Sequence, residues 1–245
     1  MRITAAQGRY RTRTIRYSRK TKKALAVAAI ICAAIATSIL ATWLSAIVEE
    51  EPPGIEAYAP ANTDDPAGRQ IDWDALPPEI VAWVEVPGTS IDEPVAQATP
   101  DAPNAYLHAD AIGQGAYGTP YIDCEGSVDS RYVMVFEHHM SDGSAFADFA
   151  SFIDEGYARE HAKIIVYRRK GETLNLRPVA VDVVNASRER LVIDQEAGFG
   201  KIVEGSDLIL EEPVEDGQLF AFTTCSYQTR NSRTTVFAVW GYNAH

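Results

Sequence analysis

Hydrophobic positions follow two different patterns along the chain. Residues 24–48 form an uninterrupted run of 25 uncharged, mostly apolar residues. This is longer than the about 20 residues that an α-helix needs to cross a bilayer core. From residue 71 onward, apolar positions come in short stretches separated by turn residues, which is typical of β-strands. The pattern predicts one membrane-spanning helix followed by a β-rich domain.

Within the β-rich part, the pattern predicts many short strands and few helices. Helices are expected at about Asp74–Val84, where apolar residues recur at helical spacing, at Phe146–Phe152 and at about Gln195–Glu204. Such a composition favours a β-barrel or a β-sandwich. The predicted strands are 91–95, 106–108, 118–123, 132–137, 163–168, 173–184, 218–224 and 234–240.

Charge at the two ends of the apolar run predicts its orientation. Residues 1–23 contain nine Lys or Arg and no acid, whereas Glu49, Glu50 and Glu51 follow the run. The positive-inside rule then places the N-terminus in the cytoplasm and the body outside the cell. A cleaved signal peptide with a weak site at Leu44–Ala46 is one alternative, but its apolar core would span only about 7–15 residues. A buried core helix is another, but soluble helices rarely lack a polar face for this length.

A proline-rich and acidic segment, 49–70, follows the apolar run and predicts an extended stalk. The expected organisation is therefore a basic cytoplasmic tail at 1–23, a transmembrane anchor at 24–48, this stalk, and a folded domain at 71–245.

Composition excludes several classes of function. The net charge is −12, and residues after 48 include 34 acidic but only 13 basic side chains. Such a body repels nucleic acid, so a nucleic-acid partner is not expected. The three cysteines, Cys32, Cys124 and Cys225, do not form a disulfide framework or a zinc-ligand spacing. Cys124 is expected to be an unpaired thiol.

Three residues of the body together suggest acyl-transfer chemistry. Cys225 ends a strand-like run, His138 follows the strand at 132–137, and Arg233 begins the last strand. Taken singly, they have ordinary alternatives: an inert core thiol, a surface imidazole and a solvated guanidinium. Together they supply a thiolate nucleophile, an imidazole that moves a proton, and a permanent cation for an oxyanion. The order His, Cys, Arg differs from the Cys, His, Asn order of papain-like proteases.

The sequence around these residues resembles sortases, and class B sortases most closely. Ala221–Cys225 (AFTTC) is similar to the family's TLxTC signature, and Arg233 matches its downstream arginine. Glu137–Phe146 (EHHMSDGSAF) resembles the class B segment around the catalytic histidine, and it aligns His138 rather than His139. The similarity continues in order over nearly the whole exported domain. Departures are Ala221 and Phe222 in the signature and Glu137, where the family has glycine.

The resemblance implies a closed eight-stranded sortase β-barrel with added helices, of which Asp74–Val84 and Gln195–Glu204 are class B-like additions. It also implies that His138, Cys225 and Arg233 are catalytic. His108 is interpreted as structural. The residues expected to contact substrate are Thr223, Thr224, Ser226 and Tyr227, with Thr224 positioning the substrate carbonyl.

The implied reaction joins two substrates. The enzyme cleaves a C-terminal sorting motif, NPxTx-like, after threonine in a secreted protein and forms a thioacyl intermediate at Cys225. An amine of a cell-wall peptidoglycan precursor or of a pilin lysine then takes the acyl group. No cofactor is expected, and neither is the calcium of class A sortases.

Two other classes of function remain open from the sequence. One is a catalytically decayed, membrane-tethered binding or scaffold protein on a sortase fold, which the departures Ala221 and Glu137 suggest. The other is a zinc site using His138, His139 and Cys225. Adjacent strand residues point to opposite sides, which disfavours that site.

Overall fold

The computed structural model describes residues 18–47, 58, 69–112, 118–186, 196–213, 215–227 and 231–241. The chain divides after Glu51 into two units. In the first, helix α1 (Arg19–Ile47) runs through the apolar segment. Among the described residues, one helix is long and apolar enough to cross a membrane, over Arg19–Leu40.

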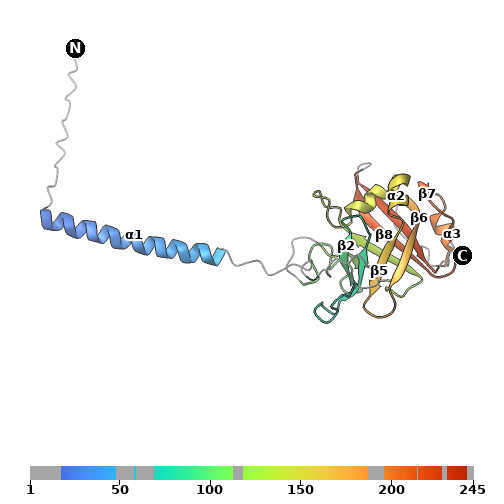
Figure 1. The fold of residues 1–245 in the computed structure, drawn as a ribbon, viewed down its shortest axis with the longest axis horizontal. Coiled ribbons are helices and arrows are strands. Elements are labelled where there is room, and N and C mark those ends of the chain that lie inside the picture. Colours follow the sequence, from blue (N-terminus) through green and yellow to red (C-terminus); the bar gives the residue numbers. More distant parts are fainter. Residues whose placement is uncertain are drawn as a thin grey trace, which may run out of the picture. The chain divides into compact units, whose positions relative to one another are not determined.

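The second unit contains a closed β-barrel (Figure 1). Eight strands pair in the order β5-β1-β2-β3-β4-β8-β9-β6, and a pairing between β5 and β6 closes the ring. β7 adds a ninth strand against β6. The predicted eight-stranded barrel is therefore confirmed. The strands are β1 (Ile80–Glu85), β2 (Asp92–Gln97), β3 (Tyr121–Ile122), β4 (Tyr132–Glu137), β5 (Ile164–Arg168), β6 (Leu174–Asn185), β7 (Leu208–Ile209), β8 (Gln218–Ser226) and β9 (Ser232–Trp240).

Strand β8 is buried on both faces, which fixes its position in the barrel wall. Phe220 and Phe222 belong to the interior core, whereas Leu219 and Ala221 belong to a separate cluster that includes residues of α3 (Phe199–Val203). Successive strand residues point to opposite faces, so one strand serves both clusters. A one-residue slip would move the interior phenylalanines to the outer face.

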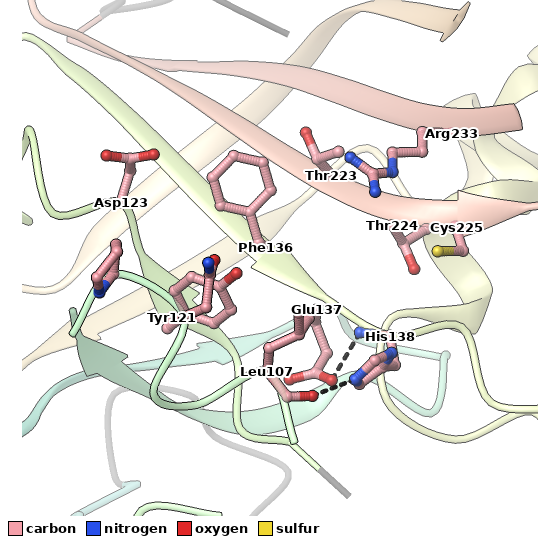
Figure 2. Close-up of a pocket in the computed structure, with 12 residues that line it drawn as sticks. Leu107, Tyr121, Asp123, Phe136, Glu137, His138, Thr223, Thr224, Cys225 and Arg233 are labelled. Atoms are coloured by element: carbon pink, nitrogen blue, oxygen red, sulfur yellow. Dashed lines mark hydrogen bonds between the residues drawn. The ribbon is translucent and has the colours of Figure 1, made fainter. Parts of the chain in front are cut away.

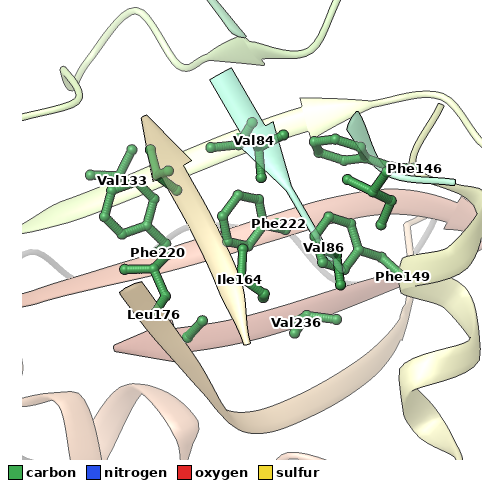
Figure 3. Close-up of a cluster of buried hydrophobic side chains, with 14 of the residues drawn as sticks. Val84, Val86, Val133, Phe146, Phe149, Ile164, Leu176, Phe220, Phe222 and Val236 are labelled. Carbon is green, nitrogen blue, oxygen red and sulfur yellow. The ribbon is translucent and has the colours of Figure 1, made fainter. Parts of the chain in front are cut away.

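Aromatic side chains fill the barrel interior beside η2 (Ala147–Ile153), a 3₁₀-helix that contacts β8 and β9. Phe149 stacks on Phe222 with ring centroids 5.0 Å apart, and Phe146 packs edge-on against both (Figure 3). The short helix α2 (Glu155–Glu160) follows, and the Asp154 side chain caps it by accepting the Tyr157 amide at 2.9 Å. This packing joins the core to β8, the strand that carries Cys225.

The predicted helix at Asp74–Val84 is wrong. Its second half is β1, which pairs with both β2 and β5. Pro78 removes a backbone donor that a helix beginning at Asp74 needs, and each proline disfavours the helical conformation of the residue before it. The apolar residues Ile80 and Val84 instead lie in a strand whose neighbours bury them completely.

Other elements differ from the prediction in smaller ways. The strand expected at 106–108 is wrong, because these residues form turns, although the Tyr106 carbonyl accepts the Thr119 amide at 3.0 Å. The helical segment at Phe146–Phe152 is confirmed one residue later as η2. The one at Gln195–Glu204 is confirmed only as the shorter α3, and Gln195 itself lies outside the described residues. Neither α2 nor β7 was predicted.

Arg69 and Gln70, assigned to the stalk by composition, are described with the folded unit. The Arg69 side chain is buried and bridges Glu85 at 2.7 Å and Asp92 at 2.6 Å. Tyr58 apart, the segment 49–68 lies outside the described residues.

Candidate active site

A cavity of about 390 Å³ lies where β4, β8 and β9 bring their polar ends together (Figure 2). It contains all three residues that the sequence assigned to catalysis. The residues that line it are Pro103, Asn104, Leu107, Tyr121, Asp123, Phe136, Glu137, His138, Thr223, Thr224, Cys225 and Arg233.

Cys225 and Arg233 are directly opposite residues of the antiparallel pair β8 and β9. Their side chains therefore project from the same face of the sheet. The Cys225 side chain is exposed, and no ion pair among the described residues involves Arg233. The cleft thus holds an accessible thiol beside a cation that is free of carboxylate partners, as an oxyanion site requires.

Two hydrogen bonds hold His138 just beyond the end of β4. Its backbone amide donates to Glu137 Oε1 at 2.6 Å, and its ring Nε2 contacts the Leu107 carbonyl (Figure 2). A carbonyl oxygen only accepts, so Nε2 carries the ring hydrogen and Nδ1 is left to take up a proton. The His108 ring stacks on the His138 ring with centroids 5.9 Å apart. His108 therefore lies beside the candidate base.

His139 has a different role from its neighbour. Its Nδ1 hydrogen-bonds the Cys225 backbone carbonyl at 2.9 Å, and its ring meets the edge of Tyr227 at a centroid distance of 4.7 Å. These contacts join the end of β4 to the end of β8. His139 thus supports the backbone of the nucleophile, whereas His138 faces the cavity.

The four residues expected to contact substrate lie in two environments. Thr223 and Thr224 line the cavity, and Thr223 Oγ1 lies 3.0 Å from Thr235 Oγ1. Ser226 is buried, with its hydroxyl bonded to Ser232, and Tyr227 is exposed against His139. Neither Ser226 nor Tyr227 is among the cavity-lining residues, and their contact with substrate stays a prediction.

Glu137 is a buried acid in the wall of this cavity. It is 7% exposed, and its Oε2 has no hydrogen-bond partner among the described residues. Burial raises the pKa of its carboxyl to about 7, only partly opposed by the hydrogen bond from the His138 amide. The sequence marked Glu137 as a departure from the family without assigning it a function.

The raised pKa predicts that stability falls as pH rises. Between pH 4.5 and about 7 the unfolded chain releases the Glu137 proton while the folded protein keeps it, so folding loses free energy. The full loss, on the order of 3 kcal/mol, is reached above pH 7. Glu137→Gln should flatten this pH dependence in urea unfolding, whereas Glu125→Gln, at an exposed carboxylate, should leave it unchanged. A fall of the same size in the Glu137→Gln protein would contradict this prediction.

The described cysteines form no disulfide. Cys32, Cys124 and Cys225 are all free thiols, so the unpaired state predicted for Cys124 is confirmed. Partial burial and the carboxylates of Asp123 and Glu125 raise the pKa of the Cys124 thiol. No group of three or more His, Cys, Asp or Glu in the described part of the chain is placed to hold a metal ion, which disfavours the zinc hypothesis.

Half of the cavity wall was missed by sequence reasoning. Pro103, Asn104 and Leu107 come from the turns before β3. Tyr121 of β3 and Phe136 of β4 pack together with their ring centroids 5.8 Å apart. Leu107 and Tyr121 lie in segments that carry the family resemblance, but none of these residues was assigned to the site. Pairing of β3 with β4, and of β4 with β8, brings Tyr121 and Phe136 to the nucleophile strand, and their spacing in sequence gives no signal of it.

Comparisons with known proteins establish the fold. No protein-family model and no curated protein matches the chain. Among solved structures, sortase B of Staphylococcus aureus bound to substrate matches with a TM-score of 0.58 at 18% identity, covering 68% of this chain and 81% of that one. Sortase B of Clostridium perfringens matches at 0.56 and 23%, covering 67% and 95%. Sortase B of Bacillus anthracis, in complex with AAEK2, matches at 0.58 and 24%, covering 68% and 79%. The barrel therefore has the sortase fold.

Proposed function

We propose that this chain is a membrane-anchored cysteine transpeptidase of the sortase type, with class B character. The observation that carries the proposal is the shared cavity of Cys225, His138 and Arg233 on a sortase barrel. Each of the three has the environment that its role requires: an exposed thiol, an imidazole whose Nδ1 is left to take up a proton, and a guanidinium that forms no ion pair with any residue the structure describes.

In the proposed reaction, His138 Nδ1 takes the Cys225 proton and the thiolate attacks the carbonyl carbon of a threonine in the sorting motif. Arg233 stabilises the oxyanion that forms. His138 returns the proton to the leaving amine as the C–N bond breaks, which leaves a thioacyl group on Cys225. An acceptor amine then attacks the thioacyl carbon, gives a proton to His138, and releases the Cys225 sulfur.

We infer that the peptide substrate is the C-terminal tail of a secreted protein with an NPxTx-like motif. The acceptor is an amine of a peptidoglycan precursor or of a pilin lysine. The resemblance of the Cys and His segments to class B sortases supports this substrate class. The S. aureus neighbour was solved as a complex with its substrate.

We also propose that residues 24–48 anchor the enzyme in the cell membrane. Leu25, Ile30 and Ile39 on α1 are all more than half exposed, as expected of side chains that face lipid. The nine basic residues of 1–23 would remain in the cytoplasm, with the segment 49–70 as a stalk and the catalytic domain at 71–245 outside the cell.

A peptide-library assay with a primary amine acceptor tests the proposed function. We expect a motif of the NPxTx type to be cut after threonine, and mass spectrometry should find the amine joined to that threonine. Cleavage of no peptide in the library, by a protein that is folded and labelled at Cys225 by a thiol reagent, would favour the scaffold hypothesis instead.

Arg233→Ala should lower kcat/KM for cleavage of the same peptide by about 10²–10³-fold, because one oxyanion-stabilising group is lost. Arg233→Lys should recover part of the rate, since the charge stays while the planar guanidinium is lost. Arg177→Ala, at an arginine of β6 outside the cavity, is the matched control and should keep the wild-type rate. An Arg233→Ala rate within about threefold of wild type would remove Arg233 from the mechanism.

A further inference from the structure

Three buried polar residues form a continuous row across β4, β8 and β9. The register pairs Glu137 with Thr224, and Thr224 with Thr234. Two residues earlier in the same register, Val135 pairs with Phe222, and both belong to the interior core. Because side chains alternate along a strand, Glu137, Thr224 and Thr234 continue the inward face of the barrel at its end. We call these three residues the polar row.

Four buried side-chain nitrogen or oxygen atoms in the described part of the chain have no hydrogen-bond partner, and three of them belong to the polar row. Those atoms are Glu137 Oε2, Thr224 Oγ1, Thr234 Oγ1 and, elsewhere, Arg69 Nε. The three row residues are at most 7% exposed. A buried polar atom without a partner costs about 1–3 kcal/mol, so three on one face of adjacent strands are a costly arrangement. All three atoms lie on β8, which carries Cys225, or on its two neighbouring strands, and this grouping suggests that they have a function.

We propose that Glu137 is a positioning residue that acts through Thr224, the residue before Cys225, by setting the direction of the Thr224 hydroxyl hydrogen. This inference deepens the proposed function and rests on it, because Thr224 is the residue expected to hold the substrate carbonyl. Paired side chains on neighbouring strands about 4.8 Å apart need only small rotations to share a hydrogen bond.

The two protonation states of Glu137 have opposite effects on that hydroxyl. A protonated carboxyl donates from Oε2 to Thr224 Oγ1, and the Thr224 hydrogen is then free to donate to a substrate carbonyl. An ionised carboxylate only accepts, so it draws the Thr224 hydrogen toward itself and away from substrate. The carboxyl has a pKa of about 7, so both states are populated near neutral pH.

Other titratable and charged groups also face this end of the cavity. Tyr121 and Asp123 come from the β3 segment, Arg233 comes from β9, and His138 follows β4 with His108 stacked on it. The charges on these groups also bear on the rate at Cys225. Comparison of two proteins at the same pH cancels these contributions and isolates that of Glu137.

The test compares single-turnover thioacylation of Cys225 in wild type and in Glu137→Gln. A glutamine amide reproduces the protonated acid, since its oxygen accepts the His138 amide and its nitrogen donates to Thr224. We expect the two rates to be equal at about pH 5.5 and the variant to be about fivefold faster at about pH 8.5. The midpoint of this change in the rate ratio should lie at the Glu137 pKa of about 7. In a Thr224→Val background the ratio should not change with pH. A ratio that is constant in the Thr224 protein, or that still varies in the Thr224→Val background, would overturn the proposal.

A second measurement does not depend on activity. In a double-mutant cycle of urea unfolding at about pH 8.5, Glu137→Ala and Thr224→Val should be coupled by about fivefold in the folding equilibrium constant, because alanine makes no hydrogen bond to Thr224. The same cycle with Thr223→Val, on the opposite face of β8, should show no coupling. If wild type forms no thioacyl enzyme, the proposed function fails, and this cycle alone decides whether Glu137 and Thr224 are linked. Absence of coupling overturns the polar row in either case.

Discussion

Cys225→Ala is expected to abolish cleavage of the sorting peptide, with a loss of at least about 10⁴-fold in kcat/KM. The sulfur forms the covalent bond to the acyl group, and alanine has no atom that can replace it. The side chain is exposed at the end of β8, so its loss should leave the unfolding free energy within about 0.5 kcal/mol of wild type. Peptide cleavage and urea unfolding of the same preparation measure both effects.

Cys124→Ala is the matched control for that variant. Cys124 packs against the cluster around Trp83 and Tyr121 and does not line the cavity. Cys124→Ala should therefore lower the unfolding free energy but keep the cleavage rate, whereas Cys225→Ala should lose the cleavage rate and keep the unfolding free energy. A Cys225→Ala protein with full activity would rule out the mechanism, whatever the fold.

His138→Ala is expected to lower the thioacylation rate by about 10²–10⁴-fold, the range found when a general acid–base group is removed. The loss should appear in kcat, because His138 transfers a proton in the transition state. Added imidazole should restore part of the rate, since removal of the ring leaves space beside the Leu107 carbonyl.

The two neighbouring histidines supply controls that separate chemistry from support. His139 holds the Cys225 carbonyl, so His139→Ala should slow the reaction less than His138→Ala and should not respond to imidazole. His108→Ala removes only a ring contact with His138 and should cost less still. If His139→Ala showed the larger loss and the imidazole rescue, the assignment of the base would move to His139.

The strand pattern predicted a β-barrel or a β-sandwich because most strands carry their own signal, and the resemblance to sortases implied the closed eight-stranded barrel. β4 and β8 are continuous runs of apolar residues with polar ends, and their bounds were predicted to within two residues. The failure at Asp74–Val84 came from apolar spacing that suits a helix face as well as a strand. Pro77 and Pro78 were a local signal against the helix, whereas the pairing of β1 with β2 and β5 that makes the segment a strand is not visible in local sequence.

The candidate site was predicted only where local motifs exist. The segments around Cys225 and His138 carry the resemblance, and the cavity holds both. The contacts of His138 with Leu107 and of His139 with Cys225 join residues at least 31 positions apart, so no motif could contain them.

Glu137 is a case in which the signal was present but was not used. Val133 and Val135 alternate on the inward face of β4, and the next position of that alternation is Glu137. An acid at the inward position of a buried strand predicts desolvation and a raised pKa. The alternation of inward and outward positions along β4 would thus have distinguished Glu137 from the many exposed acidic residues of the chain.

Intact-mass analysis of the wild-type protein, after brief mixing with a cleavable sorting peptide and no acceptor amine, tests directly whether Cys225 is the nucleophile. We expect a mass increase equal to the peptide fragment that ends in threonine, located on the proteolytic fragment that contains Cys225. Hydroxylamine should remove the added mass, as expected for a thioester, and Cys225→Ala should show none. Peptide cleavage without any adduct, or an adduct that persists in Cys225→Ala, would contradict the assignment of Cys225 as the nucleophile.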